Sequence, residues 1–389
     1  MKSTTKSITM PNEDIGNDSY YLKGAGVDLS REQHLHLENA RHLSLPRDGL
    51  FSLRDHAKPE SLEFLYIDDL HDSKFYPIVL KEMIAYCKVN GFLVLDAKRP
   101  GVISFNALKE EAIRFFQEKA ALRKEHEKET ILVFQKIKQI LEPGDSMKRW
   151  TFGIISNGKK NDQIKQQIAK IHELKVPEYE ILICGKFEET KDKKVKYLFF
   201  EAYDKGWITA QKNLILEHAK YENIVMMHDR ILPQSDFYEG LKKYGNYFEV
   251  LSCKITDAQR MRCGDWMTFG NEMRSVPRIG LLEYHDWDKH GWIDGALAIM
   301  KKSTWKKAQW DESLFWNQKE DIKLAGDWLE KGIVARFNPF SSCTTFTWRH
   351  GTLPPYLFDE KRLGKRNTPL RQKYLESAKF YIKKMLGRK

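Results

Sequence analysis

The sequence predicts an α/β protein with two domains and a basic C-terminal tail. Apolar runs of strand length alternate with segments of helical spacing, which is typical of helices packed on sheets. The composition changes near residue 150, because all ten tryptophans lie between Trp150 and Trp348. At 389 residues the chain is long enough for two or three domains. We expect a mobile N-terminus at 1–20, a first domain at 21–140, a Pro-Gly linker at 141–149, a second domain at 150–355 and a tail at 356–389.

The composition excludes several classes of protein. Hydrophobic residues make up 41% and aromatic residues 12% of the chain, which is too much for a globally disordered protein. No apolar run reaches the roughly 18 residues of a membrane-spanning helix, and the polar N-terminus does not resemble a secretory signal. The five cysteines are scattered without a CxxC pair, which argues against a disulfide scaffold or a structural zinc site. We therefore expect a cytoplasmic protein.

The positive charge is concentrated in one segment. The net charge is +11, and residues 361–389 hold eleven Lys or Arg with a single acid, Glu376, so the rest of the chain is nearly neutral. This distribution argues against nucleic acid as a partner. Residues 370–386 have the pattern of a basic amphipathic helix, which favours peripheral contact with the inner face of a membrane. The alternative is a solvated helix packed on the domain.

The first domain combines short strands with helices of different character. Asn90-Gly91 is expected to end its first helix, and the second helix is long and polar. The expected strands are 26–29, 63–67, 92–96 and 130–134, and the expected helices are 76–88 and 106–125.

This order resembles the later two-thirds of a class I S-adenosylmethionine-dependent methyltransferase domain, a truncated Rossmann-like fold. The resemblance rests on Val27-Asp28-Leu29, on residues 45–49, on the helix–turn–strand unit at 76–96 and on residues 131–136. It implies that Asp28 stands where the family holds the ribose of its cofactor. The glycine-rich turn after the first strand is absent, so little backbone can approach a cofactor. We therefore expect a degenerate domain that acts as a scaffold or as a surface for homo-oligomers.

The second domain repeats strands and helices with polar residues at the strand ends. This pattern predicts a parallel sheet, whose ligands gather at the carboxyl ends of the strands. The expected strands are 150–157, 179–185, 196–200 and 223–227, and the expected helices are 160–174, 208–218 and 321–331.

Five motifs follow one another in this region: Ser156-Asn157, Gln211-Lys212-Asn213, Met227-His228-Asp229-Arg230, Trp292-Ile-Asp-Gly-Ala296, and Trp310-Asp311-Glu312 followed by Glu320-Asp321-Ile-Lys-Leu324. With these motifs, residues 150 to about 350 resemble a GT-A-fold glycosyltransferase of the family 2 type. The spacing from Trp310 to Leu324 is the most specific of these signals.

The resemblance implies a nucleotide-sugar donor, most simply a UDP-sugar, and a divalent cation, Mn²⁺ or Mg²⁺. A hard cation takes oxygen ligands and assists the departure of a diphosphate. An acceptor hydroxyl needs a general base, and a carboxylate at a helix N-terminus suits that role. A single displacement of this kind inverts the anomeric configuration.

The resemblance assigns the following residues. The catalytic residues are Asp321 as the base and Glu320 beside it; the nucleotide-sugar is bound by Ser156, Asn157, Gly185, Lys212, Asn213, His228, Asp229 and Arg230; the acceptor side holds Trp266, Trp292, Asp294 and Gly295; and the metal is bound by Asp229 and His350.

The sequence therefore predicts an inverting glycosyltransferase that acts on a glycan or lipid-linked acceptor in surface polysaccharide or glycan assembly. Two alternatives remain open at this point. One is a methyltransferase that acts on a glycan. The other is a non-catalytic glycan-binding scaffold, which is favoured by Arg230, where the family carries an acid, and by Cys184, where it often has a carboxylate.

Overall fold

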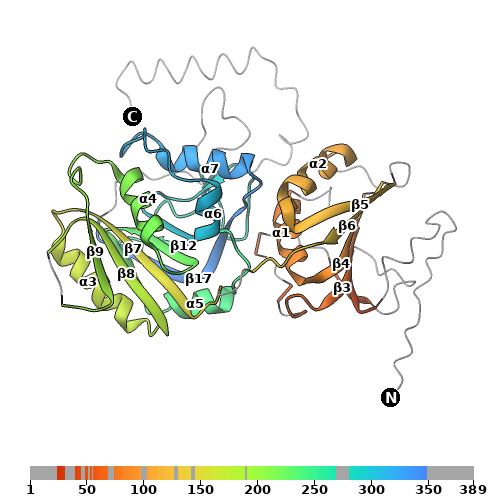
Figure 1. Ribbon diagram of the computed structural model, residues 1–389, viewed down its shortest axis with the longest axis horizontal. Coiled ribbons are helices and arrows are strands. Elements are labelled where there is room, and N and C mark those ends of the chain that lie inside the picture. The colour runs from red at the N-terminus through yellow and green to blue at the C-terminus, as the bar shows by residue number, and fades with distance from the viewer. Residues whose placement is uncertain are drawn as a thin grey trace, which may run out of the picture.

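The chain forms two units that lie side by side, each built around its own sheet (Figure 1). The computed structural model describes residues 24–30, 40–44, 49–50, 53–54, 56–68, 74–97, 103–126, 130–141, 145–188, 191–268 and 280–347. The expected mobile N-terminus, the basic tail, Trp348 and His350 lie outside the described residues. The predicted α/β class is confirmed.

The N-terminal unit has a six-stranded sheet in the order β2-β1-β3-β4-β6-β5. The first four strands are parallel, and β6 and β5 run antiparallel at one edge. Its strands are β1 Gly26–Leu29, β2 Ala40–Leu43, β3 Leu62–Asp68, β4 Cys87–Asp96, β5 Ala120–His126 and β6 Ile131–Lys136, and its helices are α1 Tyr76–Tyr86, α2 Phe105–Phe116 and the 3₁₀ turn η3 Gln117–Lys119. Helices α1 and α2 lie between this sheet and the C-terminal unit (Figure 1).

Two predicted boundaries in this unit are wrong. Helix α1 ends at Tyr86, and Asn90, with a positive φ of 71°, bends strand β4 instead of ending the helix. The long polar helix expected at 106–125 stops at Phe116, because Gln117 takes a φ of 51° and the chain then enters β5.

The C-terminal unit has an eight-stranded sheet in the order β11-β17-β12-β16-β10-β7-β8-β9, beside a small sheet in the order β14-β13-β15. Its strands are β7 Arg149–Asn157, β8 Glu178–Lys186, β9 Val195–Phe199, β10 Asn223–His228, β11 Ile231–Pro233, β12 Val250–Thr256, β13 Met267–Thr268, β14 Gly280–Leu281, β15 Gly291–Trp292, β16 Leu297–Lys301 and β17 Ala335–Thr345. Its helices are α3 Asn161–Glu173, α4 Ile208–His218, α5 Phe237–Tyr244, α6 Lys302–Lys307 and α7 Glu320–Glu330.

The sheet is mixed, whereas the sequence predicts a parallel one. Strands β9, β8, β7 and β10 are parallel, as predicted, and β16 runs antiparallel between β10 and β12. Because β16 runs the opposite way, its amino end lies at the carboxyl ends of β7 and β10, with Leu297 paired to Met227. The turn that precedes β16 therefore reaches the edge where the predicted site residues gather.

Buried side chains cover both faces of the large sheet. Helices α3 and α5 pack on one face, and α4, α6 and α7 contribute to the core on the other. That second core continues without a break into α1, α2 and the sheet of the N-terminal unit. The chain between the units is held at Asp145, whose carboxylate pairs with the buried Lys301 at 3.0 Å.

No described helix combines the length and apolar character needed to cross a membrane.

Candidate functional site

The ends of β7 and β8 form one wall of the site. The Ser156 hydroxyl donates a hydrogen bond to the carbonyl of Lys186 at 2.7 Å and accepts one from the Gly158 amide at 3.1 Å. Gly185 has a φ of +125°, and a Cβ there would lie 1.9 Å from the Ser156 carbonyl oxygen. Only a residue without a side chain allows the two strand ends to approach this closely. Asn157 is exposed at the mouth of this wall.

Side chains of helix α4 form hydrogen bonds with this wall and with the segment before α7. The Gln211 amide donates to the carbonyls of Ser156 at 3.1 Å and Cys184 at 3.4 Å. The Asn213 side chain is buried and fully bonded within the protein. Its partners are the Trp310 carbonyl and the Glu312 carboxylate, both at 2.9 Å, and the indole of Trp305 at 2.9 Å. Asn213 therefore holds the segment before α7 and has no donor left for a ligand.

Asp229 follows the end of β10 and is only 8% exposed. Its carboxylate forms an ion pair with Lys160 at 3.3 Å. Burial raises the pKa of Asp229, and the charge of Lys160 opposes that shift. Lys160 is not among the site residues that the sequence predicts. The available signal was its place just after β7, at the edge where ligands of parallel strands bind.

Arg230 connects the end of β10 to the turn before β16. Its guanidinium lies 3.7 Å from the Asp294 carboxylate, which also accepts the Ala296 amide at 2.6 Å. The neighbouring His228 amide donates to the Ala296 carbonyl at 2.9 Å, so the strand end and the turn are joined through the backbone as well. Burial raises the pKa of Asp294, and Arg230 opposes that shift.

The first turn of α7 places two carboxylates, those of Glu320 and Asp321, beside Gly295 in the turn that precedes β16. The Gly295 amide donates to the Asp321 carboxylate at 3.3 Å, and the Gly295 carbonyl accepts from the buried Lys212 ammonium at 2.8 Å. Glu320 is 7% exposed, whereas Asp321 is only partly buried. Burial raises the pKa of Glu320, against the attraction of Lys212. Burial lowers the pKa of Lys212, against the attraction of Glu320, Asp321 and Asp294.

The two predicted acceptor tryptophans lie deeper than expected. Trp266 is 0% exposed, and its indole donates to the Asp286 carbonyl at 3.0 Å. Trp292 is also buried, in a small cluster with Ile322 and Ala325 of α7. Neither side chain has the exposure needed to stack on a sugar ring in this conformation.

The predicted metal ligands do not form a complete set in the described part of the chain. Within the described ranges, no three His, Cys, Asp or Glu side chains come together as a metal site would require. Asp229 provides one carboxylate, with Lys160 and Arg230 beside it. In the N-terminal unit, Asp28 is buried and accepts the Ser30 hydroxyl at 2.7 Å, so it is not open to a ligand there.

No protein-family model matches the chain, and no curated protein matches it in sequence. Solved structures with a likeness include TarS of S. aureus, at 10% identity and a TM-score of 0.35 over 51% of this chain and 37% of TarS. A second is the catalytic domain of Drosophila β1,4-galactosyltransferase 7 in complex with xylobiose, at 11% identity and a TM-score of 0.33 over 57% and 81% of the two chains. A third is the mannosyltransferase PcManGT from Pyrobaculum calidifontis in complex with GDP-Man and Mn²⁺, at 16% identity and a TM-score of 0.35 over 52% and 58%.

The chain thus spans less than two thirds of TarS and of PcManGT. Likenesses with TM-scores this low assign neither activity nor ligands to this chain.

Proposed function

We propose that the C-terminal unit transfers a sugar from a nucleotide-sugar, most simply a UDP-sugar, to a glycan or lipid-linked acceptor, as a GT-A-type enzyme. The proposal depends on one observation: the turn at 294–295 contacts both Arg230, which follows β10, and Asp321, which begins α7. Arg230 contacts Asp294, and the next residue, Gly295, donates to Asp321. These two contacts support a single site in which the end of β10 binds the donor and the start of α7 provides the base.

Asp321 is the proposed general base. It lies in the first turn of α7, where the helix dipole favours a carboxylate by about 0.3–1 kcal/mol. It is more open than Glu320, and a base must come within hydrogen-bond reach of the acceptor hydroxyl. As that oxygen bonds to the anomeric carbon, the bond from this carbon to the diphosphate breaks and the proton passes to Asp321. One displacement of this kind inverts the anomeric centre.

Lys160 and Arg230 are the proposed groups that stabilise the leaving diphosphate. Each is paired with a carboxylate, at 3.3 Å to Asp229 and at 3.7 Å to Asp294. A diphosphate brings more negative charge than one carboxylate, so it competes well for cations placed at this edge. Binding of the donor then replaces the ion pairs of Lys160 with Asp229 and of Arg230 with Asp294.

A divalent cation remains a prediction that depends on His350, which lies outside the described residues. The described side chains do not fit a metal ion on their own, because Lys160 already occupies the carboxylate of Asp229 and the next residue is a cation. Membrane contact through 361–389 and the formation of oligomers through the N-terminal unit also remain predictions. The likeness of the N-terminal unit to methyltransferases remains a prediction as well.

The test combines binding with turnover. Thermal shifts with UDP, GDP, CMP and S-adenosylmethionine, each with and without Mn²⁺, identify the ligand, since a ligand at 100 times its Kd stabilises by about 2.7 kcal/mol. Sugar transfer is then measured with the matching donor. We expect Asp321→Asn to abolish transfer and to leave the nucleotide shift intact.

Asp327→Asn is the matched control, because Asp327 lies on the same helix in an exposed ion pair with Lys323. It should change neither quantity. Full turnover in Asp321→Asn would contradict the assignment of the base, and a shift with S-adenosylmethionine alone would contradict the proposed function. A Mn²⁺-dependent shift that is lost in Asp229→Asn would support the metal. A metal-independent shift that is lost in Lys160→Ala would support the two cations.

A further inference from the structure

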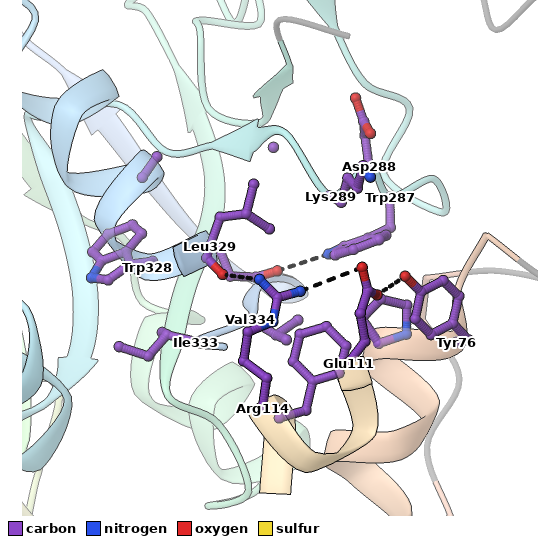
Figure 2. Close-up of a pocket in the computed structure, with 15 residues that line it drawn as sticks. Tyr76, Glu111, Arg114, Trp287, Asp288, Lys289, Trp328, Leu329, Ile333 and Val334 are labelled. Carbon is purple, nitrogen blue, oxygen red and sulfur yellow. Dashed lines mark hydrogen bonds and ion pairs between the residues drawn. The ribbon is translucent and has the colours of Figure 1, made fainter. Parts of the chain in front are cut away.

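Two side chains of the N-terminal unit reach the carboxyl end of α7. The Arg114 guanidinium donates to the Leu329 carbonyl at 2.7 Å, and the Gln117 amide donates to the Lys331 carbonyl at 2.6 Å. Both come from the end of α2. Figure 2 shows Arg114 pointing from that helix toward Leu329. The helix that carries the proposed base is thus held at its far end by the other unit.

These contacts add a cation and a further donor to that end of α7, where the Leu329 carbonyl also accepts the Gly332 amide at 3.2 Å. The last carbonyls of a helix have no partners within the helix, and a cation there interacts favourably with its dipole. Helix α7 has no basic residue in its own last turn. Gly332, just beyond it, is so close to α2 that a Cβ would lie 2.5 Å from the Arg114 carbonyl oxygen. The backbones of the two units therefore meet at this point.

Both side chains are held in place by their own surroundings. Arg114 lies 3.5 Å from Glu111, which accepts a hydrogen bond from Tyr76 (Figure 2). Gln117 has a φ of 51°, a region that favours glycine, and its amide oxygen accepts from Lys307 at 2.6 Å. A strained backbone that persists with a polar side chain points to a requirement for that side chain.

The interface around these contacts is closely packed. The cavity between α2, α7 and the segment at 287–291 has a volume of about 20 Å³, which accommodates about one water molecule (Figure 2). It is too small for a sugar or a nucleotide. This part of the interface therefore holds the units together and leaves α7 little room to shift.

We infer that Arg114 and Gln117 are positioning residues, through which the N-terminal unit fixes α7 and so the placement of Asp321. Leu329 and Asp321 are eight residues apart, which is about 12 Å along a helix. Because a helix moves as a rigid element, loss of the contacts at its carboxyl end would also displace Asp321 at its amino end. A displacement of about 1 Å can lower the rate of a reaction a hundredfold. This inference rests on the proposed function only in the role given to Asp321.

The experiment uses the full-length protein and has two readouts. Hydrogen exchange is followed in peptides that cover 320–331, and kcat and KM for the donor are measured by sugar transfer. In Arg114→Ala and in Gln117→Ala we expect exchange in α7 to rise by about tenfold. We also expect kcat to fall by about tenfold or more, with KM for the donor unchanged. Arg114→Lys, which keeps one charged donor, should restore part of both.

Arg123→Ala is the control, because Arg123 is an exposed residue of the same unit whose side chain donates a hydrogen bond to Gln135 of β6 at 2.8 Å. Exchange in α7 that stays at the wild-type value in both interface variants would overturn the inference. So would faster exchange with an unchanged kcat, since Asp321 would then not depend on the contact. A wild-type protein without transferase activity would contradict the proposed function, while exchange would still decide whether α2 holds α7.

Discussion

The ionised side chain of Glu320 lowers the stability of the folded protein. It is 7% exposed, and burial raises its pKa above the ordinary value of 4.5, although Lys212 opposes the shift. Between 4.5 and that raised pKa, the folded protein binds more protons than the unfolded chain. Stability therefore falls as the pH rises through this window, and the full penalty is present above it. Buried carboxylates that destabilise the fold are typical of functional sites.

We predict that Glu320→Gln raises the free energy of unfolding at pH 7, by the 0.5–2 kcal/mol or so of a typical stabilising substitution. Lys212 keeps the charges of Asp321 and Asp294 as counter-ions. The gain should shrink below pH 4.5, where Glu320 itself is protonated. Denaturant unfolding at pH 7 and pH 4 measures both values. Glu330→Gln, at an exposed position of the same helix, should have little effect at either pH, and an equal gain there would contradict the explanation.

Single residues differed in how well the sequence predicted them. Asp229 and Asp321 each belong to a local motif, and the structure places both at one edge of the sheet. Lys160 could not be found in this way, because its partner Asp229 is 69 residues away and no local pattern links them. Asn213 lies in a motif too, yet its amide is used by Trp305, Trp310 and Glu312, a tertiary contact that spacing does not reveal.

Strand ends and helix ends set the geometry at the next scale. The ends of β7 and β8 approach each other only because residue 185 has no side chain and takes a φ of +125°. We predict that Gly185→Ala destabilises the protein by about 1–3 kcal/mol. It should also weaken nucleotide binding, because the Ser156 carbonyl must move. Thermal unfolding with and without nucleotide measures both effects.

Gly326→Ala is the matched control for this substitution. Gly326 lies inside α7, and a Cβ there meets nothing within 4 Å. Alanine is favoured over glycine in a helix by about 0.5–1 kcal/mol, so this variant should be more stable than the wild type. If both variants lost stability equally, the loss could not be ascribed to the close approach of the two strand ends.

At this scale the sequence predicted the strands and helices between 150 and 228 but missed whole strands elsewhere: β2 and β5 in the N-terminal unit, and β12, β16 and β17 in the C-terminal unit. Strong apolar runs predicted β7, β8 and β10 within one or two residues. The hidden boundary was at 117, because no glycine or proline marks it and the polar residues after it suit a helix as well as the edge strand β5. Neither strand β16 nor its antiparallel direction was predicted, since strand direction depends on connections made far along the chain.

The two units share an apolar interface that contains a buried ion pair. Arg336 of β17 contacts Glu82 of α1 through both terminal nitrogens, at 2.7 and 2.8 Å. Two further donors of Arg336 bond to the Tyr244 hydroxyl at 2.8 Å and the Tyr247 carbonyl at 2.7 Å. An interface of this kind suppresses the relative motion that separate domains usually show.

We predict that the described units unfold in a single thermal transition, and that Glu82→Ala lowers the free energy of unfolding by about 3–5 kcal/mol, because it leaves the Arg336 charge buried without its partner. Calorimetry should then show the N-terminal unit melting first, with two transitions in the variant. Lys165→Ala, in an exposed pair with Glu188, should leave the free energy of unfolding nearly unchanged and keep one transition. Two transitions in the wild type would mean that the units fold independently. In that case the contacts of α2 with α7 would not be required for the C-terminal unit to fold, and the C-terminal unit alone would position Asp321.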